Sequence, residues 1–134
     1  IHAESRFAAL PYDAEKLSRA LAGLLDRQAR GSHCFLLAEN SQARVIGGFI
    51  GGMESYFFTS AKSANSILIW VAPDYRGSAA ALRLIGAFRE WAKNNDATEV
   101  CMLVSSGVAI GRTDRFLKRL GFKQTGGNYS ISLK

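Results

Sequence analysis

The sequence predicts an α+β protein in which helices flank a mixed, mostly antiparallel sheet. Two adjacent strand-like segments, residues 34–40 and 45–52, are separated by a short polar turn, which is typical of an antiparallel hairpin. A strand, a helix and another strand follow within residues 67–104, and this order predicts a right-handed crossover between parallel strands. The 134 residues suit a single domain over 1–134, because two half-length domains would each bury too small a core.

The first half of the chain predicts a helix, the two hairpin strands and a loop. Residues 13–30 carry leucines and alanines at helical spacing, with Asp13 placed as an N-cap and Gly31 as a stop. The hairpin strands follow, and the second (VIGGFIGG) has an unusual glycine content. Residues 53–65 are an aromatic stretch that ends in a polar loop.

The second half predicts the crossover and a second hairpin. Residues 67–71 (ILIWV) are apolar on both faces, as in a central strand that is covered on both sides. We expect a helix over 77–94, a strand over 99–104 and a short helix at about 111–120. The last segment, 122–133, alternates around a Gly-Gly-Asn turn and predicts a closing hairpin.

Composition excludes several classes of protein. A hydrophobic fraction of 48% and a charged fraction of 21% are those of a globular chain, not of a disordered or fibrous one. No apolar run reaches the roughly 18–20 residues of a membrane helix, and the first ten residues do not resemble a signal peptide, so we expect a cytoplasmic protein. Cys34 and Cys101 lie in apolar runs and are interpreted as buried hydrophobes, and no Cys or His spacing predicts a metal site.

The segment from Val71 to Leu82 carries the chemical signal. A buried strand ends there, Pro73 prevents its continuation, and small residues from Gly77 onward open a long helix. Unpaired amides at a helix N-terminus, where the helix dipole is positive, suit a phosphate or pyrophosphate. An ordinary strand-to-helix turn explains the same residues, and these physical arguments alone leave both interpretations open.

Two motifs give the segment a family resemblance. VAPDYRGSAAALRL resembles motif A of the GNAT N-acetyltransferase superfamily, V-x-P-x-[YF]-[RQ]-G-x-G-[IV]-[GA], whose glycine-rich core falls on Arg76, Ala79 and Ala81. FLKRLGF (116–122) resembles the end of the family's motif B. The resemblance extends over about residues 13–134 and implies a GNAT-like acyl-CoA N-acyltransferase fold with splayed parallel central strands.

The resemblance also implies a cofactor site and a reaction. Acetyl-CoA would bind where the central strands splay, its pantetheine arm pairing with main-chain groups of Ile69, Trp70 and Val71. The amine would attack the thioester directly in a ternary complex, with a backbone amide near Val71 stabilising the thioester oxygen and no metal involved. Arg83 is a candidate for the adenosine 3′-phosphate or part of a solvated helix face. The pyrophosphate-side residues would be Arg76, Gly77, Ser78, Ala79, Ala80 and Ala81.

The usual proton-transfer groups of the family are not at their expected positions. Residues 65–68 read Asn-Ser-Ile-Leu where many members carry a glutamate base, and Phe116 stands where many carry a tyrosine acid. Glu54 is the first candidate base and Tyr129 a candidate acid. The other candidate bases are His33 and Asp114, and Tyr56 is another candidate acid. As structural alternatives, His33 would lie beside a turn on the surface, Asp114 would pair with Arg112 or Arg115, and the tyrosines would be packed aromatics.

The beginning of the chain affects the predicted assembly. The family usually opens with a short strand, whereas this sequence starts at Ile1 with a segment, 1–9, that resembles a remnant helix. The chain is therefore either truncated or a short form. A missing edge strand would leave an unpaired edge that a second copy could cover, so we predict a homodimer.

Three hypotheses for function follow. The leading one is an acetyl-CoA-dependent N-acetyltransferase acting on a primary amine. The alternative is a catalytically weak or inactive GNAT-fold module that binds CoA or a protein partner. Nucleic-acid binding is suggested only by the net charge of +6, since no run of basic residues is interleaved with aromatics.

Overall fold

A computed structural model describes residues 2–133 of the chain. The chain divides into two compact units, one formed by Asp13–Leu103 and the other by Ile1–Tyr12 with Val104–Lys134. The first unit contains the sheet and two α-helices, and the second contains one α-helix.

The sheet has four strands in the order β1-β2-β3-β4. The strands are β1 (His33–Glu39), β2 (Val45–Ser55), β3 (Lys62–Val71) and β4 (Ala97–Cys101). The first two pairings are antiparallel and the third is parallel, which confirms the predicted hairpin, the crossover and the mixed α+β class. β3 begins five residues earlier than its apolar run suggested.

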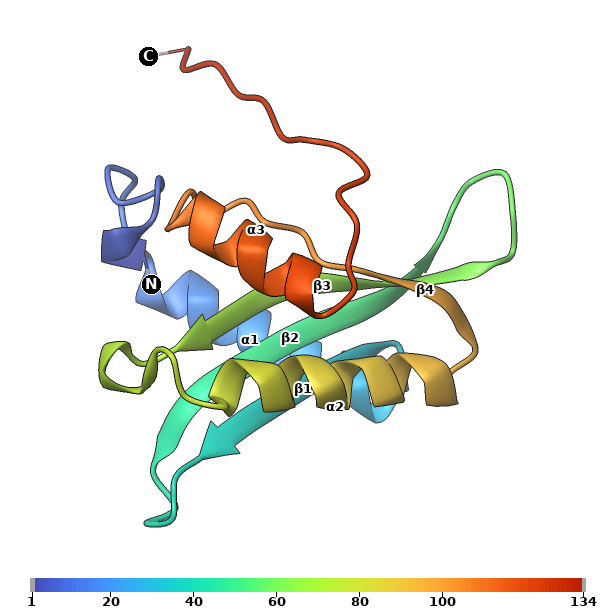
Figure 1. The fold of residues 1–134 in the computed structure, drawn as a ribbon, viewed down its shortest axis with the longest axis horizontal. Helices are drawn as coiled ribbons and strands as arrows, with labels where there is room; N and C mark the ends of the chain where they lie inside the picture. The colour runs from blue at the N-terminus through green and yellow to red at the C-terminus, as the bar shows by residue number, and fades with distance from the viewer. Residues whose placement is uncertain (1, 134) are drawn as a thin grey trace. The chain divides into compact units, whose positions relative to one another are not determined.

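Two helices pack on opposite faces of this sheet (Figure 1). α1 (Ala14–Ala29) begins as expected, because the Asp13 carboxylate accepts the N–H of Lys16 at 2.9 Å. Gly31 follows it with a φ of +79°, a conformation that favours glycine. α2 (Ala80–Asn94) starts three residues later than predicted, since a turn and a loop precede it.

The glycines of β2 make room for aromatic rings. The rings of Phe49 and Phe88 lie 4.4 Å apart between their centres, in the core between the sheet and α2. A Cβ on Gly51 would lie 2.2 Å from Cε2 of Phe88, and one on Gly48 would lie 2.6 Å from Nε1 of Trp70. Side chains at these two positions would collide with the rings, which accounts for the glycine-rich strand.

The second unit is formed by the two ends of the chain. A short 3₁₀-helix η1 (His2–Glu4) and turns replace the helix expected over 1–9, of which residue 1 lies outside the described part. The Arg6 guanidinium donates to the Ser105 carbonyl at 2.7 Å, joining the two segments. α3 (Ile110–Arg119) matches the predicted short helix to within one residue.

The predicted C-terminal hairpin is wrong, because the structure forms no strand over the described residues 122–133. The alternating apolar side chains Tyr129, Ile131 and Leu133 are 98%, 85% and 92% exposed. Alternation specifies which face of a strand is apolar, but a strand also needs a partner, and the described part of this unit contains none.

Candidate active site

β3 and β4 pair over only part of their length. Their parallel ladder ends where Asn65 stands opposite Cys101. At the next position the Ser66 hydroxyl accepts the N–H of Leu103 at 2.8 Å, so a side chain replaces main-chain pairing. In the described structure Ile67–Val71 have no partner on β4; Leu68–Val71 pair with β2, and Ile67 lies at a register shift in that ladder. We call this unpaired stretch of β3 the splay.

Backbone directions in the splay follow from one hydrogen bond. The Ala72 N–H donates to the Ile46 carbonyl at 2.8 Å, so this position of β3 is paired with β2. Paired and unpaired positions alternate along an antiparallel strand, and Trp70 therefore also directs its N–H and C=O toward β2. Ile69 and Val71 direct theirs to the other side, where a ligand with amide groups could pair with them as an added strand.

The loop after the splay is short and open to solvent. A 3₁₀-turn η2 (Pro73–Tyr75) leads into residues 76–79, which are all exposed. Gly77 has a φ of +92°, a conformation that costs other residues about 1–2 kcal/mol. The Arg76 Nε donates to the Val71 carbonyl at 3.3 Å and so ties the loop to the end of the splay.

The loop leaves two amides without an acceptor. The N–H groups of Arg76, Ser78 and Ala80 are bound, respectively, by the Pro73 carbonyl, the Tyr75 carbonyl and the Ser78 hydroxyl. Among the described residues, those of Gly77 and Ala79 have none. These two amides stand before the N-terminus of α2, where the helix dipole favours an anion.

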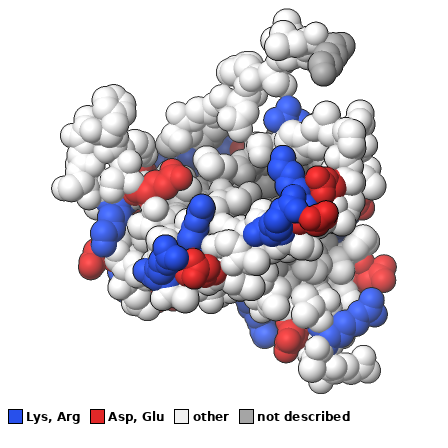
Figure 2. All heavy atoms as spheres, turned by 180° about the vertical axis from the view of Figure 1, so that it is seen from behind, with Lys and Arg blue, Asp and Glu red and all other residues white. Residues whose placement is uncertain are grey.

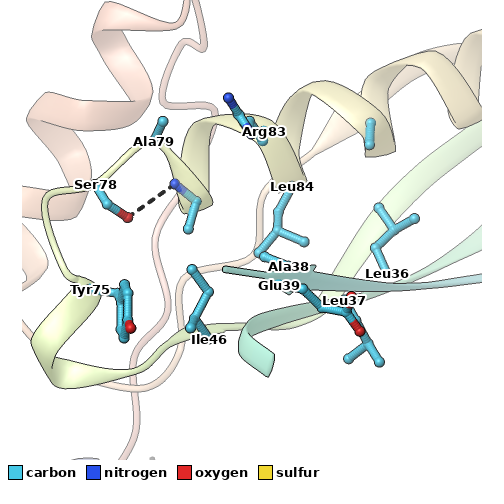
Figure 3. A pocket seen from close by; sticks show the side chains of 12 residues that line it. Leu36, Leu37, Ala38, Glu39, Ile46, Tyr75, Ser78, Ala79, Arg83 and Leu84 are labelled. Carbon is cyan, nitrogen blue, oxygen red and sulfur yellow. Dashed lines mark hydrogen bonds between the residues drawn. The ribbon is translucent and has the colours of Figure 1, made fainter. Parts of the chain in front are cut away.

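A pocket of about 510 Å³ lies beside the first turns of α2. Leu84 points from α2 toward the strands, and the Ser78 hydroxyl points back at the Ala80 amide (Figure 3). The other lining residues come from β1, β2, Tyr75 and α2, so the pocket lies on the β1 side of the helix and not at the splay. Four predicted cofactor residues line it, namely Ser78, Ala79, Ala80 and Arg83.

A row of polar side chains lies on the face of the sheet opposite α2. Gly51, against the Phe88 ring, marks the α2 side, and Asn65 pairs with the next residue and so faces the opposite side. The Asn65 amide donates to the Glu54 carboxylate at 3.3 Å. The members, hereafter the polar row, are Glu54, Tyr56, Ser63, Asn65, Glu99 and Cys101.

One end of the polar row is a tyrosine–carboxylate pair. The Tyr56 hydroxyl donates to Glu99 Oε1 at 2.6 Å. This hydrogen bond, with the negative charge of Glu99, raises the pKa of Tyr56 above its usual range. Tyr56 therefore has a neutral hydroxyl that is hydrogen-bonded to Glu99, and it is a poor proton donor. Glu54, at the other end of the polar row, is exposed and bound to a single amide.

The remaining sequence candidates have other surroundings. His33 Nδ1 lies 3.1 Å from the Ser32 hydroxyl beside the turn after α1. In the second unit, Asp114 pairs with Lys118 at 2.8 Å and not with the arginines expected from the sequence. Tyr129 belongs to the same unit, with a fully open hydroxyl and no strand around it.

The two cysteines differ in burial: Cys34 is buried as the sequence predicts, whereas Cys101 is half-buried, with its sulfur 3.6 Å from the Ser63 hydroxyl. Cys34 is a buried free thiol, and burial raises its pKa to about 11. No cluster of three His, Cys, Asp or Glu able to hold a metal occurs within residues 2–133, and none of the helices described there is long and apolar enough to span a membrane. On the face in Figure 2, basic side chains are interleaved with acidic ones and form no single stripe.

Sequence reasoning missed the polar row and the role of Ser66. Ser63, Asn65 and Ser66 lie in KSANS, which resembles a loop because its residues are polar. They are strand residues whose side chains bond to neighbouring strands. The alternation of Ser63 and Asn65 was a usable signal, but the partners across the sheet were not visible in the sequence.

Comparisons with known proteins agree with this geometry. A sequence model of the acetyltransferase (GNAT) family matches residues 3–122, while no curated protein matched the chain. AAC(6′)-Iy in complex with the bisubstrate analogue CoA-S-monomethyl-acetylneamine has a TM-score of 0.74 and 19% identity, over 97% of this chain and 87% of that one.

Two further structures show the same fold. Glucosamine-6-phosphate N-acetyltransferase from Arabidopsis thaliana has a TM-score of 0.72 and 13% identity, covering 94% of this chain and 82% of that one. Aminoglycoside 6′-N-acetyltransferase AAC(6′)-IG from Acinetobacter haemolyticus has a TM-score of 0.66 and 22% identity, covering 91% and 84%. The resemblance predicted from motifs A and B is confirmed by the family match over most of the sequence. This chain belongs to the acetyltransferase (GNAT) family.

Proposed function

We propose that the protein transfers the acetyl group of acetyl-CoA to a primary amine by direct attack in a ternary complex. The observation that carries this proposal is the splay of β3, together with the open amides of Gly77 and Ala79 beside it. A pantetheine arm has amides that could pair with Ile69 and Val71, and a pyrophosphate could accept from the two loop amides. Membership of the acetyltransferase family supports the same chemistry.

In the proposed reaction a backbone N–H stabilises the thioester carbonyl and a side chain accepts the proton. An outward N–H of the splay polarises the thioester carbonyl while the amine nitrogen forms a bond to its carbon. The carbon–sulfur bond breaks, the thiolate leaves with the electron pair, and Glu54 accepts the proton that the amine loses. Tyr129 stays a sequence-based prediction for the acid that protonates the thiolate.

The first test is calorimetric titration with acetyl-CoA. We expect micromolar binding that is lost in Gly77→Pro, which forbids the positive φ, and in Ala79→Glu, which puts a carboxylate beside the pyrophosphate. Gly86→Glu adds the same charge at an exposed site further along α2, where no atom lies within 4 Å, and should bind normally. No binding by the unmodified chain would overturn the proposal.

Turnover separates the enzyme from the alternative. Amino sugars are the first acceptors to try, because two similar structures carry them in their names. Release of CoA that depends on an added amine supports the transferase. Binding of acetyl-CoA with no release, across amino sugars, polyamines and peptide amines, would instead support the catalytically weak or inactive module.

We further propose a homodimer formed through the free edge of β1. Phe35 donates its N–H to Gln28 Oε1 at 2.7 Å, on the side away from β2, so Leu37 and Glu39 also point their backbone groups outward. Leu37 is 51% exposed at this edge. A second copy could pair with the edge antiparallel about a two-fold axis through Leu37.

Sedimentation tests this assembly. Leu37→Lys should convert a dimer to a monomer, because a lysine on an edge strand opposes pairing. Leu25→Lys makes the same change at an exposed position of α1 and should leave the dimer intact. A monomeric unmodified protein, or a dimer in both variants, contradicts the proposed edge. Both cysteines are free thiols, which is consistent with the cytoplasmic location that we propose.

A further inference from the structure

Asn65 occupies the last position at which β3 is paired on both sides. It stands opposite Cys101 of β4 and opposite Gly52 of β2, and the splay begins two residues later, at Ile67. It is also the first residue of the segment where the family resemblance leads one to expect a glutamate. The Asn65 side-chain amide therefore stands at the entrance to the splay, and it is bonded to the Glu54 carboxylate of the neighbouring strand β2.

The orientation of the Asn65 amide is set by Ser63. The Ser63 hydroxyl, itself 3.6 Å from the Cys101 sulfur, donates to Asn65 Oδ1 at 3.4 Å. With its oxygen engaged in this way, Asn65 turns its NH₂ group toward Glu54 and donates to Oε2 at 3.3 Å. Ser63 is only 3% exposed, so this side of the amide is fixed by the sheet and not by water.

We propose that Asn65 is a positioning residue that holds the Glu54 carboxylate beside the splay, so that β2 supplies the proton acceptor that is missing from β3. This inference rests on the proposed acetyl transfer. Asn65 engages Oε2 and leaves Oε1 to take the proton from the attacking amine, directly or through one water. The proton moves to Glu54 as the carbon–nitrogen bond forms and the thiolate departs, and is then released to solvent.

The second carboxylate of the polar row is less suited to this role. Glu54 and Glu99 both stand opposite Ser63, two residues before Asn65, so their register does not separate them and their bonding partners do. Glu99 Oε1 already accepts the Tyr56 hydroxyl at 2.6 Å. Glu54 is the carboxylate bonded to Asn65, next to the splay, whereas Glu99 is bonded to Tyr56, which lies beyond the end of β2 at Ser55.

The test is an exchange of the two side chains in the full chain, read as kcat and as KM for acetyl-CoA. Glu54→Gln should lower kcat by about 10²-fold or more, the usual contribution of a general base, with KM unchanged. The double variant Glu54→Gln with Asn65→Glu returns a carboxylate to β3 and should recover at least about tenfold of that loss. Glu90→Gln, an exposed glutamate of α2, is the matched control and should behave as the unmodified protein.

Asn65 is tested separately from Glu54. Asn65→Ala should lower kcat by about five- to tenfold with KM for acetyl-CoA unchanged, because one hydrogen bond to a charged group is lost. Thr98→Ala removes a comparable hydrogen bond, from its hydroxyl to the Lys62 carbonyl at 2.8 Å, and should not change kcat. An unchanged kcat in Asn65→Ala, or a double variant no better than Glu54→Gln, overturns the proposal while leaving the transferase intact.

A measurement that needs no turnover keeps the two proposals apart. The side-chain NH₂ resonances of Asn65 should shift in Glu54→Gln, which loses the charged acceptor, and stay unchanged in Glu90→Gln. Unshifted resonances in Glu54→Gln overturn the positioning contact even in a protein that shows no activity. Shifted resonances in a protein that neither binds nor uses acetyl-CoA mean that the contact holds and the acetyltransferase proposal has failed.

Discussion

At the scale of single residues, two glycines of β2 determine how aromatic rings pack on the sheet. Gly51 lies under the Phe88 ring, and Gly48 lies under the indole of Trp70. The two aromatic rings lie over opposite faces of β2, because neighbouring odd and even positions point to opposite sides. Because β2 has no side chains at these two positions, aromatic rings of β3 and α2 pack directly against its backbone.

Gly51→Ala should destabilise the protein by about 1–3 kcal/mol, because the new methyl group overlaps a ring that is fully buried. Urea unfolding followed by circular dichroism measures the change. Gly23→Ala is the matched control, since nothing lies within 4 Å of that position in α1 and alanine favours helix there by about 0.5–1 kcal/mol. Equal midpoints for the two variants would contradict the packing described for β2.

Tyr56 should titrate at a higher pH than an ordinary tyrosine, and Glu99→Gln should bring its midpoint down. The raised pKa belongs to the folded state, so the hydrogen bond contributes fully below the usual tyrosine value of about 10 and is lost as pH rises through the raised pKa. NMR titration of the Tyr56 ring resonances measures this. The Tyr56 midpoint should not move in Glu90→Gln.

At the scale of elements, the edge strand β1 is covered in part by a helix side chain. α1 has no fully buried residue, yet its Gln28 reaches the Phe35 N–H at 2.7 Å. The same bond joins the helix to the strand that follows it and occupies one of the donors at the free edge. α1 therefore limits which part of β1 remains open to a partner.

Gln28→Ala should cost about 0.5–1.5 kcal/mol of stability and expose the Phe35 amide to solvent. Hydrogen exchange of that amide should accelerate, while exchange of the even-numbered amides of β1, which face β2, should not. The resonance-resolved exchange experiment reads both sides of one strand at once. Acceleration on both sides would indicate that α1 holds the whole strand in place.

At the scale of the whole molecule, local patterns were readable from the sequence and contacts across strands were not. The α1 cap at Asp13, the first hairpin and the crossover all depend on neighbours in sequence, and each was predicted. The start of β3 was missed because Ser63 and Asn65 are polar, and the side chains that they contact, Cys101 and Glu54, lie on other strands and are far away in the sequence. The C-terminal hairpin was wrong because an alternating pattern does not supply the partner strand.

The candidate site divides in the same way. The loop at Gly77 was visible because a strand end, a proline and small residues occur together. Which amides of that loop stay open depends on turn hydrogen bonds, such as the one from Ser78 to the Tyr75 carbonyl, and these required the structure. Glu54 was chosen from the sequence as a carboxylate near the aromatic stretch, whereas its partner Asn65 was noted only as a missing glutamate.

The incomplete ladder between β3 and β4 has a consequence for the order of folding. β1, β2 and β3 follow one another with short connections, so their ladders close small loops, whereas β4 must wait for the α2 crossover to pack. We expect the β3–β4 pairing to form last, and the splay forms with it. If acetyl-CoA binds at the splay as proposed, a nascent chain that stops before β4 has only a three-stranded meander and no site for the cofactor, so binding of CoA would report that the sheet is complete.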